Sequence, residues 1–296
     1  MVKIPHFFKA GSRLGTPNPP YRQKKVNFGV EDAPDSILDN GFLNHFKSHK
    51  IDNFSFPKPE DIHPDNLFSE IVSSYTNFQK FTNQKIKDNE TQVVIGGDDS
   101  VTLPSILAVL ERISDINRFG YIRFDSHADM NLYKKSPTKN FHGMYMRPLY
   151  GNFDIPEINR IVRSKIKPQN SIFIGNLDLD EEEKKFFRKI KIRNMDRKDL
   201  QDSERIRKLI ADFSQRMNHI HISIDIDVFK KKAAPATGIP AINGLLEKDI
   251  LPVLIILREQ KNLSFDLVEV NPRKKGAQKT IKLAQKLISI LIKDVQ

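Results

Sequence analysis

The sequence predicts an α/β fold in which a mainly parallel central sheet lies between helices in a three-layer αβα arrangement. Short runs of β-branched and aromatic residues alternate with segments of helical periodicity, and neither a fixed-period repeat nor a linker interrupts them. Such alternation is typical of βαβ crossovers, which join parallel strands. An α/β fold of this length is commonly one unit, so we expect residues 1–296 to form a single domain.

Five strands are expected, and each one ends at polar residues. In an α/β sheet, ligands bind outside the carboxyl ends of the strands, so these polar residues are candidates for function. The expected strands span residues 92–95, 119–124, 171–174, 219–224 and 263–268.

Helices are expected between these strands. Residues 155–166 carry isoleucine and valine on one helical stripe, and residues 277–295 show the same spacing. A further helical pattern follows Pro104.

Composition excludes several classes of protein. The chain has no cysteine, which rules out disulfides and thiolate chemistry. No apolar run is long enough for a membrane span, and the first residues lack a signal-peptide pattern, so we expect a soluble cytoplasmic protein. The net charge of +11 raises nucleic acid as a partner. The lysines are scattered, however, which favours a solvated surface and no nucleic-acid partner.

The segment Asp125-Ser-His127-Ala-Asp129 places three potential metal ligands at alternate positions after a strand. Side chains in an extended chain repeat every two residues, so all three can share one side. A helix-capping or loop cluster is the alternative.

Two further segments have the same character. Asp225 and Asp227 follow a buried run at alternate positions, and adjacent buried carboxylates repel each other unless a cation lies between them. A salt-bridged arrangement with Lys230 or Lys231 is the alternative. The third segment, residues 96–100 (GGDDS), turns sharply through its glycines and could instead be an ordinary capping turn.

Together the three segments supply six candidate ligands at three strand ends. Carboxylates with a single imidazole suit Mn²⁺ better than zinc or copper. So many ligands suit two ions about 3.5–4 Å apart, and we therefore predict two Mn²⁺ per chain. The candidate ligands are Asp99, Asp125, His127, Asp129, Asp225 and Asp227.

These motifs resemble those of the ureohydrolase family, the arginases and agmatinases. The family's strand-end motifs read GGDHS, DAHxD and SxDxD, followed by a P-x-T-G-x-P loop and a Glu before Asn-Pro. The matching segments here are residues 29–34, 96–100, 125–129, 223–227, 235–240 and 269–272. The resemblance implies an arginase-like fold.

The resemblance also implies how the ligands divide between the two ions. Asp125 and Asp225 would bridge both ions. Asp129 and residue 99 would complete one position, while His127 and Asp227 would complete the other.

Further roles follow from the same resemblance. His142 matches a histidine that shuttles protons, Glu269 matches the acid that holds the guanidinium, and Asp129 would orient the attacking water. Two positions depart from the family pattern: Asp99 stands where the family has histidine, and Lys230 where it usually has aspartate. We expect Asp99 still to bind Mn²⁺ and Lys230 to cause only local repacking.

Four residues match positions that contact the substrate in the arginase branch. Asn131 and Thr138, with Ser136 nearby, match groups that contact an α-carboxylate. Asp180 and Glu183 match acids that receive an α-amino group. A negatively charged helix N-terminus is the alternative interpretation of this acidic stretch.

The resemblance implies hydrolysis of the guanidino group of an arginine-type substrate to urea and ornithine. Agmatine or another small guanidino compound, and arginine within a peptide, stay open as alternative substrates. A non-catalytic binding member of the family is a further alternative. By analogy with the family we expect a homo-oligomer.

Overall fold

Eight strands form one sheet in the computed structural model, which describes residues 3–17 and 27–292 of the chain. The strand order is β2-β1-β3-β8-β7-β4-β5-β6, and every pairing between these strands is parallel. This confirms the predicted α/β fold with its parallel sheet. The strands are β1 (Ile4–Ala10), β2 (Lys50–Asn53), β3 (Glu90–Gly96), β4 (Phe119–Phe124), β5 (Ser171–Ile174), β6 (Arg193–Met195), β7 (His219–Asp225) and β8 (Leu263–Val268).

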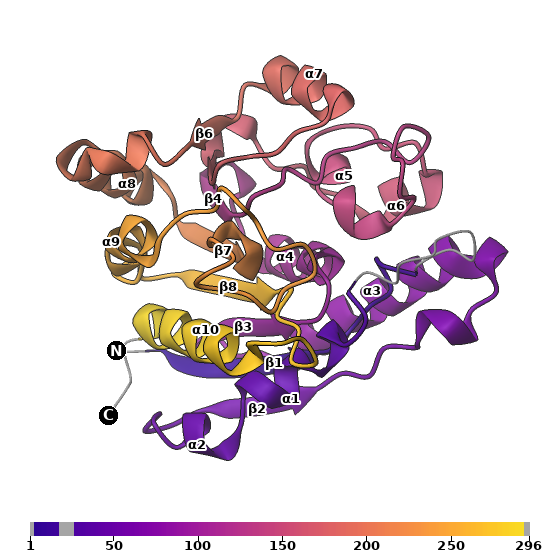
Figure 1. Ribbon diagram of the computed structural model, residues 1–296, viewed down its shortest axis with the longest axis horizontal. Coiled ribbons are helices and arrows are strands. Elements are labelled where there is room, and N and C mark those ends of the chain that lie inside the picture. The colour runs from indigo at the N-terminus through magenta and orange to yellow at the C-terminus, as the bar shows by residue number, and fades with distance from the viewer. Residues whose placement is uncertain (1–2, 18–26, 293–296) are drawn as a thin grey trace.

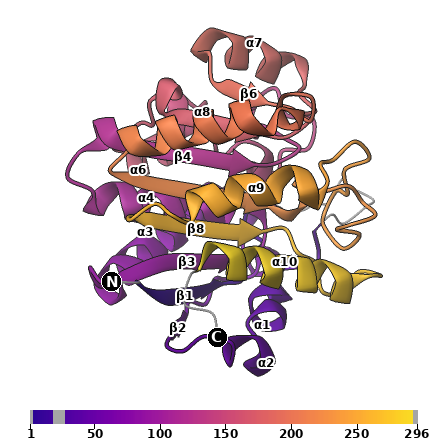
Figure 2. The ribbon, with the colours of Figure 1, turned by 90° about the vertical axis from the view of Figure 1, so that its left-hand side faces the viewer.

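Helices cover both faces of the sheet and give three layers (Figures 1 and 2). Helices α8, α9 and α10 lie along one face, and α3 and α4 lie along the other. The α-helices are α1 (Ala33–Ile37), α2 (Asn40–Leu43), α3 (Leu67–Lys85), α4 (Thr102–Arg112), α5 (Arg147–Tyr150), α6 (Pro156–Ile161), α7 (Glu181–Ile190), α8 (Ser203–Arg216), α9 (Glu247–Leu257) and α10 (Ala277–Leu291).

Alternation along the central strands gives the two faces different chemistry. In β4, Ile122 and Phe124 join the core beneath α8, α9 and α10, whereas Phe119 and Tyr121 join the core beneath α3 and α4. Because successive strand residues point to opposite faces, Arg123 shares the second face with Tyr121. The face that carries Arg123 therefore continues to the polar residues at the carboxyl ends of the strands.

Two predicted helices differ from the structure in length. The helix expected over residues 155–166 is α6, which ends at Ile161. Beyond that point the backbone amide of Ile166 donates to the carbonyl of Leu149 at 2.9 Å, so a tertiary contact replaces the next helical turn. Helix α10 ends at Leu291, and the last residues of the expected 277–295 helix lie outside the described part.

The helix expected after Pro104 already begins at Thr102, since proline is tolerated in a first helical turn. Three strands, β1, β2 and β6, were not predicted. Among the described residues, no helix combines the length and the apolar character needed to cross a membrane.

Candidate active site

The strand order brings the predicted site residues to one edge of the sheet. Strands β3, β8, β7 and β4 are consecutive neighbours. Their carboxyl ends carry Asp99, Glu269, Asp225 and Asp125 in that order. Parallel strands end at the same edge, so residues separated by up to 170 positions in the chain become neighbours.

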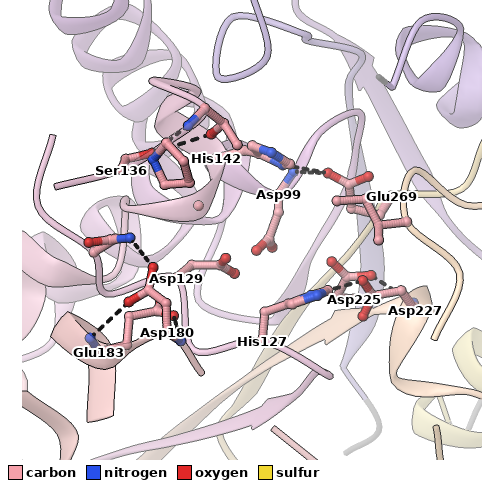
Figure 3. A pocket seen from close by; sticks show the side chains of 15 residues that line it. Asp99, His127, Asp129, Ser136, His142, Asp180, Glu183, Asp225, Asp227 and Glu269 are labelled. Carbon is pink, nitrogen blue, oxygen red and sulfur yellow. Dashed lines mark hydrogen bonds and ion pairs between the residues drawn. The ribbon is translucent and has the colours of Figure 1, made fainter. Parts of the chain in front are cut away.

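A cavity of about 200 Å³ opens at this edge (Figure 3). Asp125 is 1% exposed and is absent from the cavity wall. Every other predicted site residue lines it, namely Asp99, His127, Asp129, Asn131, Thr138, His142, Asp180, Glu183, Asp225, Asp227 and Glu269.

Two residues of the site hold an uncommon backbone conformation. Asp129 has φ of 49° and Glu269 has φ of 66°, both in the left-handed region that residues other than glycine seldom adopt. Such conformations persist where the surrounding structure enforces them, and they cluster at functional sites. For Glu269 the enforcing contact is a hydrogen bond from its backbone amide to the carbonyl of Gly97 at 2.8 Å.

The two adjacent acids after β3 have different tasks. Asp98 caps the turn that follows, because its carboxylate accepts from the Ser100 amide at 3.1 Å and from the Thr16 hydroxyl at 3.0 Å. Burial raises the pKa of Asp98 to about 6. Asp99 instead points into the cavity. The alternative of an ordinary capping turn therefore describes Asp98 and leaves Asp99 for the site.

One set of ligand atoms, from Asp125, His127 and Asp227, fits a divalent cation. These atoms all lie within 4.8 Å of one another. His127 Nδ1 is 3.1 Å from Asp227 Oδ2 and 3.5 Å from Asp125 Oδ1. Burial lowers the pKa of His127, but Asp227 and Asp125 outweigh it and raise that pKa well above its ordinary value. Two carboxylates and an imidazole are the donors expected for Mn²⁺.

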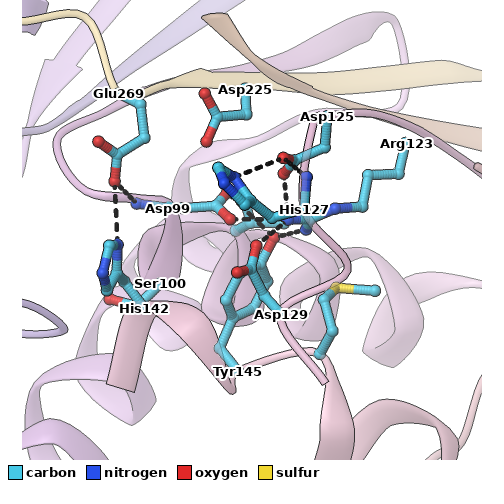
Figure 4. Close-up of polar contacts among 12 residues, drawn as sticks. Asp99, Ser100, Arg123, Asp125, His127, Asp129, His142, Tyr145, Asp225 and Glu269 are labelled. Atoms are coloured by element: carbon cyan, nitrogen blue, oxygen red, sulfur yellow. Dashed lines mark hydrogen bonds and ion pairs between the residues drawn. The ribbon is translucent and has the colours of Figure 1, made fainter. Parts of the chain in front are cut away.

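A second set, from Asp99, Asp125 and Asp225, meets the same distance criterion but has a cationic neighbour. The guanidinium of Arg123 lies among the carboxylates (Figure 4). Its Nη2 atom donates to Asp99 Oδ2 at 2.8 Å and also to Asp125 and Asp129. Three of the four residues predicted to hold one ion, Asp99, Asp125 and Asp129, therefore contact a positive charge that belongs to the chain itself.

The acids of the site differ in how burial and charge affect them. Burial raises the pKa of Asp225 well above its ordinary value, and Asp227 and Asp125 raise it further. Burial likewise raises the pKa of Asp129, although Arg123 opposes the change. Burial would also raise the pKa of Asp125, but Arg123 and then His127 lower it. Asp129 and Asp225 are therefore destabilised as carboxylates, even though Arg123 lies within the cluster.

Glu269 is held on one side and free on the other. Its Oε1 accepts from the Asn27 amide at 2.8 Å and from the Asp99 backbone at 3.0 Å, and it lies 3.4 Å from His142 Nδ1. Within the described residues, Oε2 accepts no hydrogen bond, and Glu269 lines the cavity. Burial raises the pKa of Glu269, which His142 opposes. A fixed carboxylate with one free oxygen can receive a cationic ligand.

The predicted substrate contacts lie together on the other side of the cavity. Asp180 caps α7, and its carboxylate accepts from the Glu183 amide at 3.1 Å, while Glu183 accepts from the Asp180 amide at 3.2 Å. Glu183 also accepts from the Met130 amide at 2.9 Å, and Asn131 donates to Asp180. The helix N-terminus interpretation is therefore correct for these acids, which nevertheless line the cavity.

The remaining predicted positions have simple environments. Thr138 Oγ1 lies 3.3 Å from Ser136 Oγ, and both residues line the cavity. In the described chain, no ion pair joins Lys230 or Lys231 to Asp225 or Asp227, so the salt-bridge alternative for those acids is wrong. The Lys230 backbone instead donates to Leu245 at 3.0 Å.

Sequence reasoning missed three residues of the site. Asn27 holds Glu269, Arg123 binds three acids, and Tyr145 donates to Asp99 Oδ1 at 3.0 Å and contacts Arg123. Arg123 alone left a signal: a charged residue in a buried strand, two positions before Asp125 and therefore on its face. Asn27 and Tyr145 reach the site through tertiary contacts that no local pattern encodes.

Comparison with known proteins identifies relatives along most of the chain. The model of the Arginase family matches residues 19–293. An arginase of Staphylococcus aureus strain MSSA476 is 29% identical over 89% of this chain and 90% of its own length. The arginase of strain MRSA252 is 32% identical over 69% of this chain and 68% of its own.

A solved structure of an arginase from Bacillus caldovelox superposes with a TM-score of 0.82 at 25% identity. The superposition covers 99% of each chain. The predicted arginase-like fold is therefore confirmed.

Proposed function

The chain belongs to the Arginase family and is a hydrolase of linear amidine C–N bonds, and from this premise we propose that it cleaves an arginine-type guanidino substrate to urea and ornithine. Glu269 carries the proposal, because its buried carboxylate lines the cavity while Asn27 and the Asp99 backbone amide hold it in place. A planar guanidinium binds a carboxylate by charge-assisted hydrogen bonds. The alternative of a non-catalytic member does not agree with the family's hydrolase activity.

We propose that Asp125, His127, Asp225 and Asp227 hold Mn²⁺, which supplies the chemistry of lowering the pKa of a water molecule. The proximity of ligand atoms from Asp125, His127 and Asp227 supports this assignment. The predicted count of two ions stays a prediction. We further propose that the whole chain is one catalytic domain, which the extent of the family match supports.

In the proposed reaction, Glu269 fixes the guanidinium so that its central carbon faces the acids at the ends of β4 and β7. Asp129 accepts a hydrogen bond from the attacking water and orients it toward that carbon. Water adds to the guanidinium carbon, and the bond from that carbon to the alkyl nitrogen then breaks. His142, 3.4 Å from Glu269, delivers the proton that lets the amine leave. Urea and a primary amine result.

One observation favours a second substrate, arginine within a peptide. The carboxylate oxygens of Asp180 and Glu183 already accept hydrogen bonds from the protein. A free α-amino group would compete for these oxygens, whereas a peptide nitrogen makes no such demand.

Urea release from the Mn²⁺-loaded protein tests the proposal directly. The substrates to compare are arginine, agmatine, guanidinobutyrate and a peptide with internal arginine. We expect release from arginine at the highest rate. Release from the peptide alone would establish the second substrate, and release from none of the four would contradict the proposed function.

A further inference from the structure

Arg123 is a buried cation at a position where the chain is expected to hold a metal ion. Its Nη2 atom donates to one oxygen each of Asp99, Asp125 and Asp129. A single atom surrounded by three carboxylate oxygens has the environment of a bound cation. The resemblance assigns these three acids, with Asp225, to one of the two ions.

The Arg123 side chain is enclosed on all the sides that the structure describes. It is 1% exposed, and its guanidinium carbon lies 5.1 Å from the Tyr145 ring and 5.9 Å from the Phe173 ring. Phe173 is its partner across the β4–β5 pairing. An arginine is charged at any accessible pH, and a buried charge requires opposite charges beside it. If the guanidinium moved away from the acids, its charge would therefore lie between aromatic rings without a counter-charge.

The contact between Arg123 and Asp99 gives a reason for a departure noted in the sequence. Asp99 replaces the histidine of the family motif and adds one negative charge to an acidic cluster. Arg123 adds one positive charge and bonds to that same carboxylate at 2.8 Å. Tyr145 ties the pair together, since its hydroxyl donates to Asp99 at 3.0 Å and it also contacts Arg123. Asp99 and Arg123 therefore form one ion pair.

Asp125 divides its two oxygens between the halves of the site. Its Oδ2 accepts from Arg123, while its Oδ1 accepts from the His127 amide at 2.6 Å and lies 3.5 Å from His127 Nδ1. The oxygen on the His127 side stays available to a cation. The oxygen on the Arg123 side does not.

We propose that the guanidinium of Arg123 permanently occupies one of the two cation positions of the site. The chain then binds a single divalent cation, in the set formed by Asp125, His127 and Asp227. A second ion would compete with Arg123 for the same oxygens and would be repelled by its charge. This inference rests on the metal site of the proposed function, but it concerns the number of ions and not the substrate.

Metal analysis of the wild-type protein is the first test and needs no variant. After saturation with Mn²⁺ and removal of free ion by dialysis, we expect close to one ion per chain instead of two. Electron paramagnetic resonance then reports whether the ions are isolated or magnetically coupled, and we expect the spectrum of isolated ions. Two ions per chain with a coupled spectrum would overturn the inference. Binding of no ion would overturn both the inference and the proposed metal site.

Variants locate the ion and the guanidinium. Arg123→Met keeps an unbranched, apolar side-chain stem but removes the charged guanidinium, and we expect the count to rise toward two. Asp227→Ala should reduce the wild-type count to near zero, because the ion lies on that side. Arg112→Met is the control for the chemical change, since Arg112 is an exposed arginine that donates to Gln92 at 2.6 Å, away from the acids. It should leave the count unchanged.

The double variant Asp99→His with Arg123→Met guards against misfolding of the single variant. It restores the family ligand and removes both added charges, so we expect a folded protein that holds two coupled ions. A count of one in this folded double variant would show that Arg123 does not exclude the second ion. Because all these readouts count ions, a protein that releases no urea could still confirm the inference, and an active protein could still contradict it.

Discussion

Two clusters of buried polar side chains lie on the central strands of the sheet, one inside the strands and one at their carboxyl ends, and they differ in how their hydrogen bonds are completed. Inside strands β7 and β8, His221 bonds Asp266 at 2.7 Å and Ser264 at 2.8 Å. His219 bonds the same serine at 2.8 Å, and Thr102 of α4 donates to Asp266 at 2.9 Å. Each hydrogen-bond donor in this group has an acceptor. We call the group formed by His219, His221, Ser264, Asp266 and Thr102 the strand-interior network.

At the strand ends the balance fails. Asp99, Asp125, Asp129, Asp225 and Asp227 offer only acceptors when ionised, and Arg123 and His127 are their cationic neighbours. Burial raises the pKa of four of these five acids. A balanced network stabilises the fold, whereas an unbalanced one stores electrostatic cost that a bound cation relieves. A buried polar group is therefore a candidate for function when its charge or its hydrogen bonds are incompletely compensated, and not merely because it is buried.

Replacement of Asp225 should give the largest effect and opposite signs for function and stability. Asp225→Asn should weaken Mn²⁺ binding and lower urea release by about 10³-fold, since a metal ion contributes several kcal/mol to such a transition state. The pKa of Asp225 is raised in the fold. Its contribution to the stability of the metal-free protein is therefore full at low pH and is lost as pH rises through that pKa.

The metal-free Asp225→Asn protein should accordingly melt at a higher temperature than metal-free wild type at neutral pH, and the two should converge in acid. Thermal melts across pH, with chelator present, measure this. A lower melting temperature for the variant at neutral pH would show that Asp225 is as well compensated as the strand-interior network.

His142→Ala tests a residue that touches the cluster only through Glu269. Its kcat should fall by about 10²- to 10⁴-fold, the range for loss of a general acid–base group. Metal content should stay at the wild-type level, because His142 Nδ1 contacts Glu269 and not the acids of β4 or β7. Metal analysis and kinetics on the same sample check both parts. Loss of the ion would make His142 a ligand.

The two acids at the N-terminus of α7, Asp180 and Glu183, accept hydrogen bonds from the protein and also line the cavity, so their replacement sharpens the comparison. Alanine at both Asp180 and Glu183 should raise KM for arginine by about 10²-fold if each gives a charge-assisted hydrogen bond to the α-amino group. Turnover of a peptide with a blocked arginine should change little. The matched control is alanine at both Glu181 and Glu182, which lie in the same helical turn outside the cavity lining. Equal losses for both substrates would mean that the capping role alone matters.

The smallest effect on catalysis is expected from the strand-interior network. Asp266→Ala leaves His221 and Thr102 without their shared acceptor and should lower the free energy of unfolding by about 1–3 kcal/mol. Urea release per folded molecule and metal content should equal those of wild type. Denaturant titration measures the first and metal analysis the second. A variant that keeps its stability but loses metal would erase the distinction between the two clusters.

The strand ends could be predicted because their signal is local. Asp125, His127 and Asp129 alternate directly after a strand, and pleating alone places such residues on one side. The parallel sheet then brings distant strand ends to one edge. These two rules reach most of the cavity lining without any knowledge of tertiary contacts.

What sequence reasoning missed depends on partners far away in the chain. Strand β1 contains Pro5, which argues against a strand, but His6 bonds Glu90 and Asp52 on both neighbouring strands at 2.8 Å. Helix α6 ends early because Ile166 bonds Leu149. Arg123 lies within an otherwise apolar strand, and its acidic partners come from two separate stretches of chain, residues 96–100 and 125–129. The preference of a short segment for helix or strand does not include its contacts with residues far away in the chain.

The guanidinium held among the strand-end acids bears on how long the chain survives before it acquires its cofactor. A newly made protein with several buried carboxylates and no counter-charge would open readily and be exposed to proteases. Arg123 is covalently part of the chain, cannot dissociate and keeps its charge at every accessible pH. The edge of the sheet is thus partly neutralised from the moment of folding. A chain built in this way can wait for its cofactor in a folded state when the supply of the ion is scarce.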